Sequence, residues 1–159
     1  EGMTGVGILA GLSTTIHHAV IHIAGDGFRI SAAALEAVLP SAPALQKRAG
    51  LFAAIQSMQI AQTAACNRLH DVRQRMARWL LMTSDRVGAP TLSVTHDFLS
   101  TILGTDRASV TERAISLQAR GAIQYSRGKL RILDRKKLQN DACECYRATR
   151  QFNHQLGLA

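Results

Sequence analysis

Aromatic side chains are scarce in this 159-residue chain, at 4% of its residues. Proteins that bind single-stranded nucleic acid commonly stack bases on aromatic side chains, so this scarcity argues against a single-strand binder. Three cysteines are too few for a disulfide framework, and we expect a reducing cytoplasm. No apolar run approaches the roughly 20 residues that span a membrane, and no signal peptide is recognisable.

The sequence also lacks the residue combinations that enzymes use. No Ser/His/Asp or Cys/His constellation and no phosphate-binding glycine loop is evident, so no enzyme and no catalytic residue is predicted. His17, His18 and His22 suggest a metal site, but on a strand His17 would point away from the other two. Cys143 and Cys145 are expected within one helix, where their side chains would point about 200° apart. We therefore predict buried or idle thiols, no metal and no cofactor.

Positive charge is in excess. Nineteen Lys and Arg residues against 11 Asp and Glu residues give a formal net charge of +8. This excess indicates a polyanionic partner, although a basic surface can also serve solubility alone. An apolar content of 47% is enough for the core of one domain, or of one domain and part of another.

The segment Thr95–Gly121 has the pattern of two short helices joined by a tight turn at Gly104, with Asp106 as the N-cap of the second helix. Apolar residues recur on one face of each helix. They are Leu99, Ile102 and Leu103, then Val110, Ala114 and Leu117. The arrangement is typical of a DNA-binding helix-turn-helix, whose second helix enters the major groove by its N-terminus. An ordinary helical hairpin would share it.

Polar side chains on the opposite face of the second helix can reach base edges. They are Arg107, Ser109, Thr111 and Glu112. A basic hairpin follows, with predicted strands Ala122–Tyr125 and Lys129–Leu133 around a turn that contains Gly128. A hairpin in this place is a wing, and its tip suits phosphate contacts by Ser126, Arg127 and Lys129. The wing favours DNA binding over a plain helical hairpin.

The chain begins with Glu1 rather than Met, as expected of a fragment or a processed product. We expect residues 1–40 to be the remnant of a β-roll effector domain, since Ala19–Ile23 and Phe28–Ile30 are predicted to pair as a hairpin. A short helix from Ser31 to Pro40 follows.

Residues 44–69 are predicted to form one long helix of about 39 Å. A seam recurs along it at alternating intervals of four and three, the heptad period of a coiled coil. Its residues are Leu51, Ile55, Met58, Gln62, Ala65 and Leu69, continuing to Val72. We expect residues 41–70 to form the helix of a symmetric dimer, with Gln62 setting the register. Packing on the chain's own core is the alternative.

Residues 71–159 are expected to form a winged helix-turn-helix domain, in a fold that is mainly α with a small β part. Asp71 is predicted to cap a helix from Val72 to about Asp85. That helix should turn Met76, Trp79, Leu80 and Thr83 inward and Arg73, Arg75 and Arg78 outward. A final helix is predicted from Arg135 to about Phe152, capped by Asp134.

This order of elements resembles the Crp/Fnr family of bacterial transcription regulators. The resemblance lies in Val94-Thr95, Leu103-Gly104, Arg107–Arg113, Gly121–Ile123, Arg127–Lys129 and Ala142–Tyr146. It implies a winged helix in a homodimer that reads a palindromic operator in double-stranded DNA, with RNA polymerase as a further partner. It places Arg107, Ala108 and Glu112 at base-reading positions and Ser109 at a phosphate contact. It places Arg73, His96 and Lys129 near other backbone contacts.

The chain also departs from the family. Regulators of the cAMP type read bases with Arg, Glu and Arg, so Arg107, Ala108 and Glu112 imply a different operator. Glu1-Gly2 is not followed by an Arg before Arg29, and no N-terminal cysteine cluster is present. Sensing of a cyclic nucleotide or by an iron–sulfur cluster is therefore unsupported. A dimerising module that sequesters partners without binding DNA is the alternative function.

Overall fold

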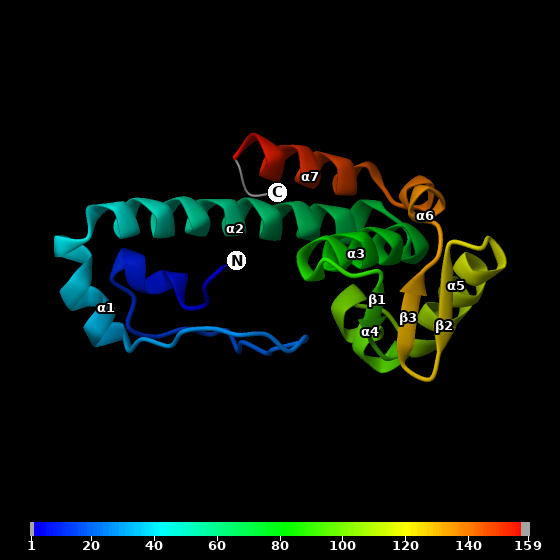
Figure 1. Cartoon of the computed structure of the whole chain (residues 1–159), viewed down its shortest axis with the longest axis horizontal. Coiled ribbons are helices and arrows are strands. Elements are labelled where there is room, and N and C mark those ends of the chain that lie inside the picture. Colours follow the sequence, from blue (N-terminus) through cyan, green and yellow to red (C-terminus); the bar gives the residue numbers. More distant parts are fainter. Residues whose placement is uncertain (1, 157–159) are drawn as a thin grey trace. The chain divides into compact units, whose positions relative to one another are not determined.

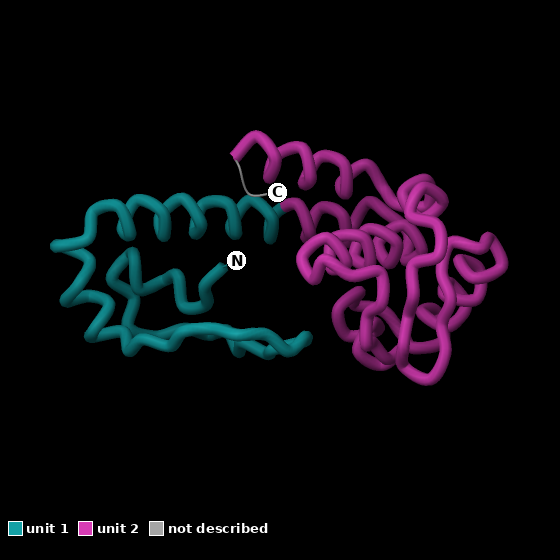
Figure 2. Tube along the Cα trace, viewed as in Figure 1, with its two compact units in different colours: residues 1–61 teal, residues 62–159 magenta. Residues whose placement is uncertain are grey.

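The computed structural model describes residues 2–156. Glu1, the first residue of the Glu1-Gly2 pair considered for cyclic-nucleotide binding, lies outside the described residues. The chain divides into two compact units, residues 1–61 and 62–159 (Figure 2). The fold is mainly helical with one small sheet, as predicted (Figure 1). Among the described residues, no helix combines the length and the apolar character that a membrane crossing requires.

The first unit contains short helices and irregular chain before the long helix. Its elements are a 3₁₀ helix η1 (Val6–Ala10), α1 (Ala32–Val38), a 3₁₀ turn η2 (Leu39–Ser41) and most of α2 (Pro43–Leu69). The Ser31 hydroxyl accepts from the amide of Ala34 and starts α1 as predicted. The predicted hairpin of Ala19–Ile23 with Phe28–Ile30 is wrong, because residues 12–30 form no strand. A lone hairpin is marginally stable, and Phe28 is fully exposed here.

The second unit begins within α2 and continues through a capped break. The Asp71 carboxylate accepts from the amide of Gln74, whose side chain accepts from the amide of Asp71 in return. This capping box starts α3 (Val72–Val87), which ends at Gly88. Then follow β1 (Thr91–Ser93), α4 (His96–Leu103), α5 (Arg107–Ala119), β2 (Ile123–Ser126) and β3 (Lys129–Ile132). The predicted helix-turn-helix and wing are thus confirmed as local structure.

A three-stranded antiparallel sheet supports the wing, in the order β1-β3-β2. The pairing of β1 with β3 was not predicted, since it joins residues nearly forty positions apart. The inner face of the sheet packs on helices α3, α4 and α5 and on α6 (Arg135–Asp141) around one apolar core. Its fully buried side chains include Met76, Leu80, Leu99, Leu117 and Leu130. The core holds α5 and the wing as parts of one body.

The predicted single helix from Arg135 to Phe152 is wrong. Two helices are present, α6 (Arg135–Asp141) and α7 (Glu144–Gln155). Ala142 and Cys143 lie between them with extended backbones, at ψ 153° and 163°. Cys143 therefore precedes α7 as its N-cap, and only Cys145 is helical. The 200° separation expected for these two thiols does not apply.

Candidate nucleic-acid interface

An N-cap at Asp106 begins α5, the second helix of the helix-turn-helix. Asp106 accepts from both the hydroxyl and the amide of Ser109, each at 2.7 Å. These hydrogen bonds, the hydroxyl first, lower the pKa of the Asp106 carboxyl below its usual value. A carboxylate here also suits the positive end of the helix dipole. The Ser109 hydroxyl is thus part of the cap, and a contact with DNA would compete with that bond.

Three of the predicted base-reading residues are exposed on the first turns of α5. Arg107, Ala108 and Glu112 all face solvent, and 68% of the Arg107 side chain is accessible. Arg107 Nε lies 3.4 Å from a carboxylate oxygen of Asp97, in a pair exposed on both sides. Exposed pairs of this kind contribute little, so Arg107 can exchange Asp97 for a ligand at small cost. Glu112 lies 3.5 Å from Arg113.

A network joins the helix-turn-helix to the wing. His96 Nδ1 shares a 2.8 Å hydrogen bond with the Thr111 hydroxyl, and its ring stacks on Tyr125 with centroids 4.3 Å apart. The Tyr125 amide donates to Gln118, which ties β2 to α5. Burial, followed by the charge of Arg107, lowers the pKa of His96. His96 Nε2 is buried and has no partner among the described residues. Contacts of His96 or Thr111 with DNA would require this pair to separate.

The tip of the wing is a tight turn with two left-handed residues. Arg127 has φ 48° and Gly128 has φ 77°, the conformation of a two-residue type I′ hairpin. A glycine adopts this backbone cheaply, and Arg127 takes it while presenting its side chain to solvent. Ser126, Arg127 and Lys129 are all exposed, as the predicted phosphate contacts require.

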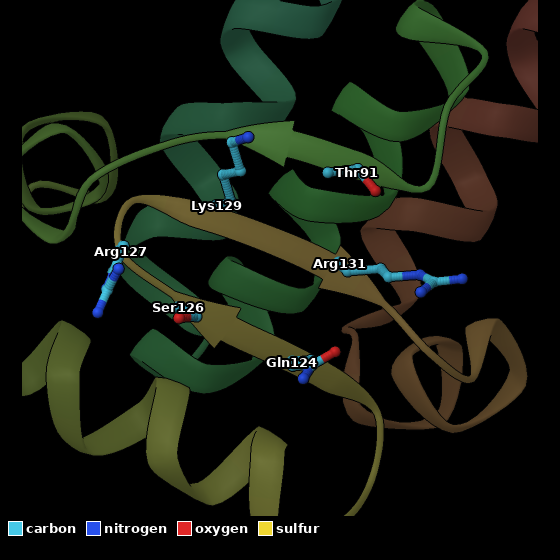
Figure 3. Close-up of a pocket in the computed structure, with 6 residues that line it drawn as sticks. All are labelled: Thr91, Gln124, Ser126, Arg127, Lys129 and Arg131. Carbon is cyan, nitrogen blue, oxygen red and sulfur yellow. The ribbon is translucent and has the colours of Figure 1, made fainter.

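Arg131, on the outer face of the sheet, is an exposed cation that was not predicted. Figure 3 shows a hollow on this face lined by Thr91, Gln124, Ser126, Arg127, Lys129 and Arg131. Lys129 and Arg131 alternate with the buried Leu130 and Ile132 along β3, so they point to the same side. The alternation was readable in the sequence, but which face is solvated depends on where the core lies.

The arginines of α3 do not all face outward as predicted. Arg73 Nη1 donates to the buried carboxylate of Asp141 at 2.6 Å, and Arg120 reaches the same oxygen at 3.1 Å. Arg75 donates to the carbonyl oxygen of Leu103 at the end of α4. Arg78 is buried, so its outward placement is wrong. The partner of Arg73 lies 68 positions away in the sequence. A phosphate contact would use the guanidinium N–H groups of Arg73 that do not bond to Asp141.

The predicted dimer seam is only partly available on α2. Leu51, Met58, Ala65 and Leu69 are exposed. Ile55 is buried at 4% exposure, and the Gln62 amide nitrogen donates to Cys145 Sγ of the same chain. The spacing of the seam fits an exposed apolar stripe, but Ile55 and Gln62 are engaged with other residues of the same chain.

The three cysteines lie together, which the sequence reading missed. Cys66 Sγ is 3.5 Å from Cys143 Sγ, and Cys145 Sγ is 3.7 Å from His70 Nδ1. All three thiols are buried and free of disulfides. Burial raises the pKa of the thiols of Cys66 and Cys143. Cys143 and Cys145 were predicted to be buried or idle thiols, and both are buried. The expectation that they diverge is wrong, because the break before α7 turns both toward α2.

Residues 74–141 are similar to a known family of domains. These residues match the family model of the Crp-like helix-turn-helix domain, which confirms the resemblance predicted for the helix-turn-helix and wing. A search of curated proteins found no match.

Two solved structures share the fold. One is a transcriptional regulator of the Crp/Fnr family from Eubacterium rectale, with TM-score 0.55 and 23% identity over 69% of this chain. The other is a CRP-family transcriptional regulator from Thermus thermophilus, with TM-score 0.55 and 22% identity over 60% of this chain. The matches cover 50% and 52% of those proteins, so this chain spans about half their length.

Proposed function

Because residues 74–141 match the family model of the Crp-like helix-turn-helix domain, we propose that the chain is a transcription regulator that binds double-stranded DNA sequence-specifically. The proposal rests chiefly on one observation. The first two turns of α5 present Arg107, Ala108 and Glu112 to solvent, next to a wing with exposed Arg127 and Lys129. An exposed helix start reads base edges, and flanking cations hold the phosphate backbone.

The network around His96 supports this reading. Its hydrogen bond to Thr111 and its stacking on Tyr125 join α4, α5 and the wing. A surface fixed in this way loses little conformational entropy on binding, which favours affinity. The proposal therefore assigns base reading to the exposed side chains of α5. Positioning of the helix and the wing is assigned to the half-buried His96, Thr111 and Tyr125.

We further propose a homodimer on a palindromic operator. The exposed apolar stripe on α2 supports it, since Leu51 and Met58 are 49% and 56% exposed in the single chain. A parallel pair of such helices would bury the stripe and present two recognition helices about 34 Å apart, one turn of duplex. Cytoplasmic location and contact with RNA polymerase remain parts of this proposal.

A sequestering module is the second candidate, because α2 alone would support dimerisation. Selection of binding sites from a random duplex pool separates the two functions. A transcription regulator is expected to enrich one motif with two-fold symmetry. A dimer that enriches no motif and shifts no duplex would contradict DNA reading and favour sequestration.

Salt dependence tests the wing. Lys129→Ala is expected to weaken binding to all sequences about equally, because a phosphate contact carries no base information. The slope of log K against log salt should flatten by roughly two per dimer, one per subunit. Fluorescence anisotropy across a salt series measures it, with Lys136→Ala, an exposed lysine on α6, as the control. An unchanged slope for Lys129→Ala would remove this residue from the phosphate contacts.

A further inference from the structure

Four potential metal ligands converge where the end of α2 meets the start of α7. They are Cys66, His70, Cys143 and Cys145, whose ligand atoms all lie within 4.8 Å of one another. From this geometry we infer that the chain holds a structural zinc ion in a Cys₃His site. The inference does not depend on the proposed DNA binding.

Two of the separations are those of ligands on a single tetrahedral ion, and all four ligand atoms lie within 4.8 Å of one another. With Zn–S bonds of about 2.3 Å, tetrahedral geometry places two sulfurs about 3.8 Å apart. The measured separations are 3.5 Å between Cys66 Sγ and Cys143 Sγ and 3.7 Å between Cys145 Sγ and His70 Nδ1. A polynuclear iron–sulfur cluster would hold its ligands on different irons and needs a wider set. Three thiolates and an imidazole are also a common ligand set of structural zinc.

The backbone explains why these ligands meet. Cys66 and His70 are four residues apart at the end of α2, where the His70 amide still donates to the Cys66 carbonyl, so both side chains lie on one face. Cys143 is the extended N-cap of α7, and Cys145 lies in its first turn. The break between α6 and α7 is what turns both of these thiols toward α2.

The groups around the cluster fit a metal centre. The other ring nitrogen of His70, Nε2, lies 3.0 Å from a carboxylate oxygen of Glu144, which fixes Nδ1 toward the thiols. Metal-binding histidines usually carry such a carboxylate on the second nitrogen. The Gln62 amide nitrogen donates to Cys145 Sγ at 3.1 Å, a bond that would stabilise a thiolate.

A buried positive charge lies close to the cluster. Arg78 is 6% exposed, and its charge acts on the Cys66 thiol. Arg78 Nη2 donates to the Thr63 hydroxyl at 3.1 Å, but no ion pair among residues 2–156 includes Arg78, and its Nε is unpartnered there. Buried charges require compensation. Zinc held by three thiolates and a neutral imidazole has a net charge of −1, which this guanidinium would balance.

Metal content of the untagged full chain tests the site. Protein expressed with zinc supplementation and dialysed without chelator is expected to hold about one zinc ion per chain, as measured by inductively coupled plasma mass spectrometry. Cys143→Ser/Cys145→Ser should lose the metal. His154→Ala removes an exposed histidine of the same helix and should retain it. Glu144→Gln should weaken zinc affinity by about 10- to 100-fold while keeping all four ligands.

Two further measurements keep the result clear if the double variant folds poorly. Cobalt(II) added to the metal-free wild type should give the intense visible bands of tetrahedral coordination together with thiolate charge transfer. Removing zinc should lower Tm by about 5–10 °C, restored by stoichiometric zinc. Zinc-treated wild type that stays metal-free with three titratable thiols would overturn the site. So would a Cys66–Cys143 disulfide, or several irons with acid-labile sulfide.

Discussion

Arg107→Ala is expected to reduce affinity for the selected operator by about 1–3 kcal/mol per half-site, or about 2–6 kcal/mol for a dimer on both. Arg107 is the first residue of α5, and its guanidinium is exposed beside the helix N-terminus that would enter the groove. The forked guanidinium can bond O6 and N7 of a guanine together, a pair of acceptors that no other base presents. The variant should therefore also relax the preference at one symmetric pair of positions.

Two controls separate base reading from general attraction. Arg107→Lys keeps the charge but loses the fork, so it should retain much of the non-specific affinity and have a weaker guanine preference than the wild type, because an ammonium can still donate to O6 and N7. Arg147→Ala removes an exposed arginine of α7 and should leave the selected motif unchanged. Competition binding with single-position operator variants measures each effect. If Arg107→Ala selects the same motif as the wild type with equal stringency, Arg107 contacts only phosphate.

Leu51→Asp/Met58→Asp is expected to convert the proposed dimer into monomers. Both side chains are exposed in the single chain, so the folded monomer tolerates the charges, whereas a paired helix would bury them without partners. Ile55 is a poorer target than the heptad pattern implies, because it is already buried within its own chain. Operator affinity should fall by about 10²- to 10⁴-fold, since the second half-site is no longer bound at high effective concentration.

Sedimentation equilibrium measures the first effect, and anisotropy on a two-half-site duplex measures the second. Ser57→Asp/Ala64→Asp adds the same charge at exposed positions on another side of α2 and should remain dimeric. A Leu51→Asp/Met58→Asp protein that still sediments as a dimer would show that the interface lies elsewhere.

Much of the candidate interface was predictable because its signals are local. Asp106 three residues before Ser109, Gly104 at a left-handed position and Gly128 in a two-residue turn each determine backbone geometry through neighbours in the chain. The spacing of Val110, Ala114 and Leu117 assigned the buried face of α5 correctly, because helical periodicity is a property of the segment itself. The surface that would face DNA follows as the opposite side.

The sequence alone thus determined the helix-turn-helix, the wing and the helix caps, where each choice depends on residues within a turn of one another. Only the tertiary structure decided which arginines of α3 are engaged, since Arg73 and its partner Asp141 are 68 positions apart. It likewise decided that Ile55 is buried and that Cys66 and His70 meet Cys143 and Cys145. Contacts at such separations depend on how helices pack, and no local periodicity encodes that packing.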